Sequence, residues 1–112
     1  MNKLDNGVPP AQPEREQYSA TVTVHDPQGL HLRRSKDVVR VASQFHSQIT
    51  AQNLSRRSGQ VDVKSILQLM QLQARPGHVI RLQAAGPDAV DALDALCALF
   101  RPAPLPGVVS GA

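Results

Sequence analysis

The segment Gly29-Leu30-His31-Leu32-Arg33 places a histidine and an arginine two residues apart, where a loop gives way to a predicted helix. The first turn of a helix exposes unpaired backbone N–H groups and a partial positive charge, so it stabilises a bound anion. A ring nitrogen of His31 can act as a nucleophile, and the guanidinium of Arg33 can fold toward an anionic group carried on that ring. These residue types and this spacing predict a nucleophilic histidine beside an anion site.

The ordinary role of a single histidine near a helix start is to be solvated or to cap the helix. Here Arg34 and Lys36 add positive charge, and Gly29 lets the backbone turn tightly just before the histidine. Because the loop, the histidine, the arginine and the helix start occur together, their combination favours a functional site.

The elements that hold this segment follow from the spacing of apolar residues. Alternation of apolar and polar residues predicts strands over residues 20–24, 49–54, 61–63 and 80–84. Helical spacing and start signals predict helices over about residues 31–45, 65–72 and 87–100. The order β-α-β-β-α-β-α predicts an α+β domain with a four-stranded antiparallel sheet, three helices on one face and a solvated opposite face.

The two later helices carry start signals. Ser65 is the expected N-cap of the second helix. In the third helix, Gly86 is the expected N-cap and Pro87 the first residue, with Asp88 in the first turn, where the helix dipole favours an acid. The predicted apolar stripe of this helix consists of Val90, Leu93, Cys97 and Phe100. The cysteine is therefore expected to be a buried, inert thiol.

Length, composition and charge limit the class of protein. The 112 residues suffice for one domain, predicted over 18–100, with a flexible leader over 1–17 and a proline-rich flexible tail over 101–112. There is no membrane-length apolar run and no secretory segment, and the single cysteine suits a reducing compartment, so a cytoplasmic protein is expected. The histidines lack metal-ligand spacing, so no metal is predicted. The net charge of +3 suits nucleic acid, an acidic protein surface or a phosphorylated ligand equally.

Two motifs in register resemble those of the histidine-containing phosphocarrier protein (HPr) family of the bacterial sugar phosphotransferase system. The family signature G-L-H-x-R-P is similar to Gly29-Leu30-His31-Leu32-Arg33, and K-S-[IL]-[ML] is similar to Lys64-Ser65-Ile66-Leu67 at the family's spacing. The family's approach to its last helix resembles Ala85-Gly86-Pro87-Asp88-Ala89. The resemblance covers about residues 18–100 and implies the open-faced β-sandwich of that family.

The resemblance implies a carrier cycle. His31 would accept a phosphoryl group at Nδ1 from phosphorylated enzyme I and donate it to a histidine of a sugar-specific permease domain or a regulator. Arg33 and the first helix amides would hold the phosphoryl oxygens, and the protein would need no cofactor of its own. Such a chain is a phosphocarrier with a transient phosphohistidine rather than a stand-alone enzyme, with no nucleic-acid or membrane partner.

The second motif adds a regulatory expectation. Ser65 resembles the serine that a dedicated serine kinase phosphorylates in some bacteria. The alternative is an ordinary N-cap, and the two roles are compatible. The neighbouring Ile66, Leu67 and Met70 have the spacing of core residues, but a short helix cannot bury every apolar side chain. One or two of them are therefore expected to contact partner proteins.

Arg34 departs from the family pattern, which has proline there. A proline in the first turn pre-sets φ and needs no N–H partner, so its replacement loosens the helix start. Arg34 instead adds a cation near the expected phosphate. The departure therefore bears on partner choice and on the stability of the phosphoryl group.

Two alternatives to sugar transport stay open. One is a regulatory paralogue that acts by phosphorylation-dependent docking. The other is a basic nucleic-acid-binding α+β module. The sequence disfavours this module, because it lacks the aromatic strand residues of an RRM-like sheet and the GxxG loop of a KH fold.

Overall fold

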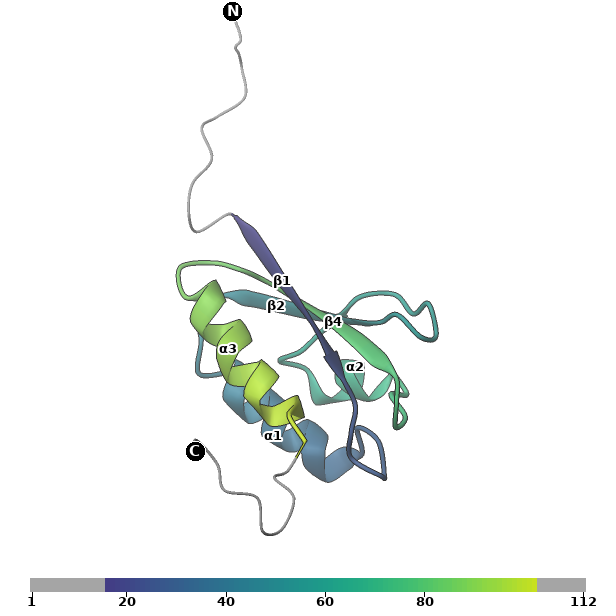
Figure 1. Ribbon diagram of the computed structural model, residues 1–112. Coiled ribbons are helices and arrows are strands. Elements are labelled where there is room, and N and C mark those ends of the chain that lie inside the picture. Colours follow the sequence, from purple (N-terminus) through teal and green to yellow (C-terminus); the bar gives the residue numbers. More distant parts are fainter. Residues whose placement is uncertain (1–15, 103–112) are drawn as a thin grey trace, which may run out of the picture.

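The computed structural model describes residues 16–102 of the chain. Its elements in chain order are β1 (Gln17–Thr23), α1 (Leu32–Ala42), β2 (Gln48–Asn53), β3 (Val61–Asp62), α2 (Ile66–Met70), β4 (Val79–Ala85) and α3 (Ala89–Phe100). This is the predicted order of strands and helices (Figure 1). The flexible leader predicted over 1–17 and the tail predicted over 101–112 lie outside the described residues, apart from the innermost two residues of each.

One antiparallel sheet forms a layer of the domain. Its strand order is β1-β4-β2-β3, so the first strand pairs with the last and β4 lies between β1 and β2. Leu82 of β4 pairs with Ala20 of β1 and with Ala51 of β2, which puts the three side chains on one face. The helices cover that face, with α1 and α3 in contact (Figure 1). The predicted four strands with three helices on one face are confirmed.

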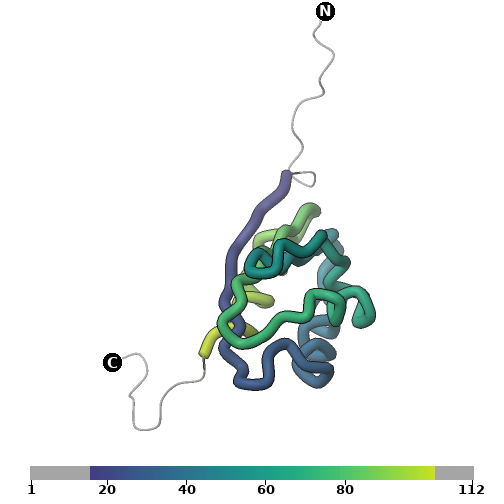
Figure 2. The backbone as a smooth tube through the Cα atoms, turned by 90° about the vertical axis from the view of Figure 1, so that its right-hand side faces the viewer, coloured from purple at the N-terminus to yellow at the C-terminus, as the bar shows by residue number. Residues whose placement is uncertain are grey.

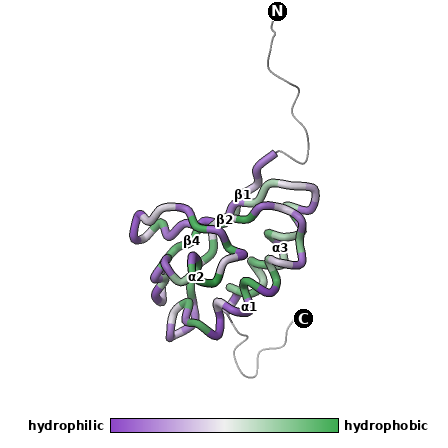
Figure 3. The backbone as a smooth tube through the Cα atoms, turned by 180° about the vertical axis from the view of Figure 1, so that it is seen from behind, coloured by the Kyte–Doolittle hydropathy of each residue, from purple (hydrophilic) through white to green (hydrophobic). Residues whose placement is uncertain are grey.

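The core lies between the helices and the inner face of the sheet. It is built from aliphatic side chains, and Phe100 is the one aromatic residue among the buried side chains of residues 16–102. The sheet contributes Ile49 and Ile80, and α1 contributes Val38, each of them almost fully buried. Burying one such side chain is worth about 1.5–3 kcal/mol. Hydrophilic residues, purple in Figure 3, concentrate in the connecting loops at the periphery.

The start of α3 differs from the sequence prediction. The helix begins at Ala89 with Asp88 at the N-cap, so the predicted N-cap at Gly86 is wrong by two residues. The Asp88 carboxylate accepts hydrogen bonds from the N–H groups of His46 and Ser47, at 2.9 and 3.0 Å, and from the Ser47 hydroxyl. These bonds, that of the hydroxyl foremost, hold the pKa of Asp88 below its ordinary value. Asp88 thus ties the helix start to the α1–β2 connection.

The buried face of α3 is also shifted from the predicted stripe. Val90 is 50% exposed and Cys97 is only partly buried, whereas Leu93 and Phe100 are buried as predicted. The other buried positions of the helix are Ala89, Ala92 and Leu96. Apolar residues surround most of this helix, so spacing alone does not select its inner face, and small alanines let it approach its neighbours closely. Burial raises the pKa of the Cys97 thiol.

The two shorter helices, α1 and α2, end slightly earlier than the sequence predicts. Helix α1 stops at Ala42, so Phe45 packs from the following loop rather than from the helix, and α2 stops at Met70 rather than Leu72. Within residues 16–102, no helix has the length and apolarity needed to cross a membrane.

Candidate functional site

The loop that leads into α1 is closed by its own hydrogen bonds. The Gln28 N–H donates to Asp26 Oδ1 at 2.9 Å, and the Gly29 N–H donates to the Asp26 carbonyl at 2.8 Å. An aspartate side chain commonly starts a turn by bonding the backbone two residues on. The turn reverses the chain and places Asp26 within hydrogen-bond distance of His31.

Gly29 fixes this loop against the rest of the domain. Its φ of 72° lies in the left-handed region, and a Cβ there would stand 2.5 Å from the Ala74 carbonyl oxygen. The same carbonyl accepts a hydrogen bond from the Leu30 N–H at 2.8 Å. Figure 2 shows the blue loop beside the green segment that precedes β4. Glycine alone meets both requirements without strain, and the predicted tight turn before the histidine is confirmed.

A buried amide supports the segment around Ala74. Asn53 is fully buried, and its Nδ2 group donates to the Leu72 carbonyl and to His78 Nδ1, both at 3.0 Å. The Arg75 N–H also donates to His78 Nδ1, at 3.1 Å. With two donors on Nδ1, the imidazole of His78 carries its proton on Nε2. The sequence patterns single out neither Asn53 nor His78 for this role, because their partners come from separate segments.

His31 is the N-cap residue of α1, and its ring makes no capping hydrogen bond. Its carbonyl accepts the first helical bond, from the Ser35 N–H at 2.8 Å. The amides of residues 32–34 donate to no other described residue, so this positive helix end is open to an anion. Ser35 is fully buried, and its hydroxyl donates to the Leu30 carbonyl at 3.3 Å, which fastens the first turn.

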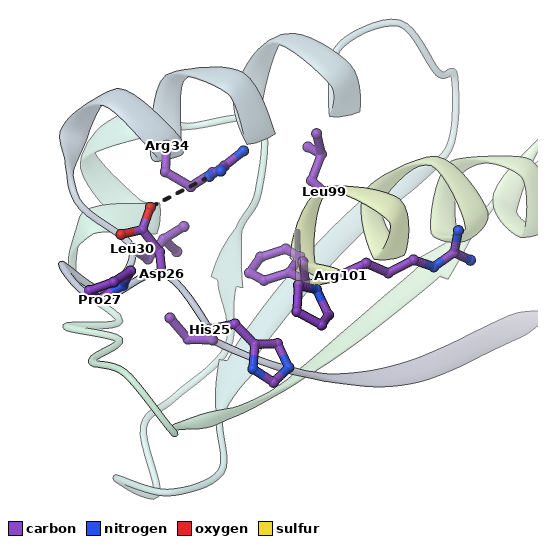
Figure 4. A pocket seen from close by; sticks show the side chains of 11 residues that line it. His25, Asp26, Pro27, Leu30, Arg34, Leu99 and Arg101 are labelled. Carbon is purple, nitrogen blue, oxygen red and sulfur yellow. Dashed lines mark ion pairs between the residues drawn. The ribbon is translucent and has the colours of Figure 1, made fainter. Parts of the chain in front are cut away.

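A carboxylate and an arginine flank the His31 ring. His31 Nε2 lies 3.2 Å from Asp26 Oδ2. Arg34 Nε lies 4.0 Å from the same oxygen, and Figure 4 marks this ion pair with a dashed line. Arg34 also extends Nη1 to within 3.9 Å of Asp37 Oδ2. The Gln28 N–H first, and then the His31 ring and Arg34, hold the pKa of Asp26 below its ordinary value. The carboxylate is therefore ionised at neutral pH.

Arg33 stands beside His31 with its charge available. The two side chains line one open hollow at the start of α1, together with Asp26, Gln28, Arg34 and Asp37. Arg33 is exposed, and no ion pair joins it to another residue of the described part of the chain. An arginine in that state keeps its guanidinium N–H donors free for an anionic group. The predicted additional cation, Arg34, is also near the ring, but two carboxylates engage it.

A second hollow, of about 280 Å³, shares Asp26 and Arg34 with the first in its lining (Figure 4). The loop contributes His25 to its lining, and the end of α3 contributes Leu99 and Arg101. Within residues 16–102, no group of three or more His, Cys, Asp or Glu side chains is placed to hold a metal ion.

Helix α2 carries the second predicted motif. The Ser65 hydroxyl accepts a hydrogen bond from the Gln68 N–H at 3.3 Å, so its predicted role as N-cap is confirmed. Leu67 is 77% exposed, Met70 is exposed to a smaller extent and Ile66 is half-buried. Helix α2 packs against α1, and Figure 1 shows the two helices on the same side of the sheet. The three predicted partner-contact residues thus differ in how far they reach solvent.

Asp26 is the site residue that the sequence alone places only in a loop. The sequence feature that could have pointed to Asp26 is the run Asp26-Pro27-Gln28-Gly29, which is typical of a turn and lies just before the histidine. Turn chemistry accounts for one carboxylate oxygen. Only the three-dimensional path of the loop shows that the other oxygen faces the ring of His31.

Comparison with known proteins places these features in a family. Residues 18–101 match the profile of the family described as "PTS HPr component phosphorylation site". A phosphocarrier protein HPr of Cupriavidus necator is 42% identical over 78 residues, which cover 70% of this chain and 84% of that protein. The crystal structure of an HPr from Bacillus anthracis superposes with a TM-score of 0.70 at 30% identity, covering 76% of this chain and 98% of that one.

The chain belongs to the HPr family of the phosphotransferase system. The predicted family and its open-faced sandwich fold are confirmed. A multiphosphoryl transfer protein of Haemophilus influenzae is also similar, at 40% identity over 76 residues, or 68% of this chain. This chain spans only 15% of that longer protein, so the match concerns an HPr-like part of it.

Proposed function

We propose that His31 accepts a phosphoryl group from phosphorylated enzyme I and passes it to a histidine of a sugar-specific or regulatory acceptor. The observation that carries the proposal is the position of His31 at the open start of α1, with Arg33 in the same hollow. Membership of the HPr family supports a role in phosphoryl transfer within the phosphotransferase system. The chain would act as a carrier in the cytoplasm, with no cofactor of its own.

The geometry suits a transfer that depends on placement and charge. The ring of His31 stands at the rim of the open helix end, and the free amides of residues 32–34 offer donors to phosphoryl oxygens. The exposed guanidinium of Arg33 adds charge-assisted hydrogen bonds to the same oxygens. Stabilising charge as it develops is the main contribution a protein makes to phosphoryl transfer, so no further catalytic group is needed here.

The partner surface would combine apolar and cationic side chains around His31. Leu32 and Leu67 are exposed large hydrophobic residues on α1 and α2, and exposed Arg33 and Lys36 lie on the first turns of α1. Exposed aliphatic side chains together with exposed cations fit a partner that presents an apolar patch with acidic neighbours. Met70 extends the same apolar surface along α2.

Ser65 would be a second phosphorylation position, used by a serine kinase for regulation. Its hydroxyl is bonded to the Gln68 N–H at a helix start, where a phosphate would meet backbone donors. A dianion there would repel an acidic donor protein approaching α2. Modification of Ser65 would therefore slow phosphorylation of His31.

Phosphoryl transfer from labelled phosphoenolpyruvate, in the presence of enzyme I and Mg²⁺, tests the role of His31. One phosphate per chain, stable in base and lost in acid, is expected on the wild type and none on His31→Ala. The matched controls are His25→Ala and His46→Ala, which remove exposed histidines and are expected to retain the label. Label that remains on His31→Ala contradicts the proposal.

Sugar uptake separates a transport carrier from a regulatory paralogue. In a strain that lacks its own HPr, this chain is expected to restore phosphotransferase-dependent uptake, and His31→Ala is not. Labelling of His31 without any recovery of uptake would favour the regulatory paralogue that acts by docking.

A further inference from the structure

One carboxylate decides which nitrogen of the His31 ring is free. The Gln28 N–H holds one oxygen of Asp26 at 2.9 Å, and the other oxygen lies 3.2 Å from His31 Nε2. An ionised carboxylate only accepts hydrogen bonds, so the ring donates from Nε2 and carries its proton there. In a neutral imidazole the other nitrogen, Nδ1, then has a lone pair and no proton. The contact thus selects Nδ1 as the nucleophile.

A carboxylate so close to the ring also opposes phosphoryl chemistry, because it repels the incoming anionic group. Arg34 is placed to offset this charge, since its Nε lies 4.0 Å from the Asp26 oxygen that faces His31. A second ion pair, of Arg34 Nη1 with Asp37 at 3.9 Å, keeps the side chain along the first turn of α1. The positive charge of Arg34 thereby offsets part of the negative charge of Asp26, which stays ionised and keeps its hydrogen bond to the ring.

We infer that Asp26 is a positioning residue for His31 and that Arg34 offsets its negative charge, so that the two act together to present Nδ1 to a phosphoryl donor. The inference rests on the proposed function of His31. In the transfer, the Nδ1 lone pair forms the new N–P bond, while the bond from phosphorus to the donor nitrogen breaks and returns its electron pair to the donor. Nε2 keeps its proton, so the phosphorylated ring carries a positive charge that the Asp26 carboxylate stabilises.

The first test needs no donor protein. Long-range ¹H–¹⁵N spectra of labelled protein distinguish a ring protonated on Nε2 from one protonated on Nδ1. The wild type is expected to show the Nε2–H form of neutral His31, and Asp26→Ala a mixture of both forms. Asp26→Asn, whose amide oxygen can still accept from Nε2–H, is expected to restore the wild-type form in large part. Asp94→Asn removes an exposed carboxylate of α3 and serves as the matched control.

The second test measures intrinsic reactivity with phosphoramidate, a small phosphoryl donor that releases ammonia and needs no docking. Asp26→Ala is expected to slow phosphorylation of His31 about tenfold, as expected for loss of a hydrogen bond to a charged group. Arg34→Gln is expected to slow it in the wild-type background and to have little effect when Asp26→Asn is also present. Strictly additive effects of these two substitutions would overturn the pairing of Asp26 with Arg34.

The two proposals fail in different ways. If neither phosphoramidate nor enzyme I labels His31 of the wild type, the proposed function fails, and the tautomer spectra still decide the role of Asp26. If His31 is labelled but Asp26→Ala matches the wild type in tautomer and rate, the positioning role is overturned and the carrier function stands.

Discussion

The starts of helices α1 and α2 place a polar residue at the same capping position and use it in opposite ways. At α2, the Ser65 hydroxyl accepts the Gln68 N–H, which satisfies one of the free amides within the chain. At α1, the ring of His31 turns toward Asp26, and the amides of residues 32–34 donate to no other described residue. The start of α2 is capped within the chain, which stabilises the helix, whereas the start of α1 stays open to an external anion.

Because its amides stay uncapped, the start of α1 needs support from other parts of the chain. A missing cap costs about 1 kcal/mol at a helix start. At α1 the buried Ser35 hydroxyl bonds the Leu30 carbonyl, and the loop before it is bonded to Ala74. These two contacts hold the first turn in place while leaving its amides free. Function and stability are thus assigned to different groups of the same helix end.

The largest expected effect at the open start comes from Arg33→Ala. Loss of a charge-assisted hydrogen bond to the phosphoryl group is worth about 1.5–3 kcal/mol, so the transfer rate is expected to fall about 10- to 100-fold. Because Arg33 is exposed, its removal is expected to change the free energy of unfolding by less than about 0.5 kcal/mol. Enzyme I-dependent labelling and urea unfolding measure the two quantities.

The matched control is Arg40→Ala, which removes an exposed arginine paired with Asp37 near the other end of α1. It is expected to leave the transfer rate within about twofold of wild type, since exposed ion pairs contribute little. Equal losses for both variants would show that overall charge, rather than the place of Arg33, matters.

The support of the open start can be broken at Gly29. Gly29→Ala is expected to lower the free energy of unfolding by about 1–3 kcal/mol, because it adds a strained φ to a close contact. Gly77 also has a positive φ, of 85°, but nothing within 4 Å of an added Cβ, and Gly59 has neither feature. Urea unfolding is expected to rank the losses Gly29→Ala, Gly77→Ala, Gly59→Ala. Equal losses at Gly29 and Gly77 would contradict a supporting role for the contact with Ala74.

The smallest effects come from changing the two caps. Ser65→Ala is expected to lower the free energy of unfolding by about 1 kcal/mol, and His31→Ser to raise it by about 0.5 kcal/mol, because serine can cap the open amides. The second variant would be more stable and unable to carry phosphate. A loss of stability in His31→Ser would contradict the view that the amides at the start of α1 lack a cap.

Ser65→Asp tests whether the start of α2 also affects the reaction of His31. It keeps a capping oxygen and adds a negative charge, so phosphorylation of His31 by enzyme I is expected to be slower than in Ser65→Ala. Equal rates for the two variants would leave Ser65 as a cap alone.

Local sequence patterns predicted most of the fold and part of the site. Alternation located the strands, and the capping role of Ser65 follows from residue type, because both depend on near neighbours. The start of α3 was misplaced, because Asp88 is bound by His46 and Ser47, more than 40 positions earlier in the chain. No local pattern contains such a contact.

The site divides in the same way. His31 and Arg33 could be selected from a short motif at a helix start, where spacing alone sets their relation. The pairing of Arg34 with Asp26 could not be predicted, because it depends on the path of the loop that brings Asp26 back to α1. What Arg34 does in place of the family proline therefore follows only from the structure, which shows its contact with Asp26.

The pairing of the first strand with the last has a consequence for synthesis of the chain. Gln17 pairs with Ala85, so β1 has no neighbour until β4 has been made. Contacts between such distant segments close late and make folding slow. The carbonyl of Ala74, which holds the loop before His31, also belongs to the later part of the chain. A nascent chain that ends before Ala74 therefore contains His31 without the carbonyl that holds its loop, and one that ends before β4 leaves β1 unpaired. The reactive end of the molecule is thus among the last parts to be fully supported.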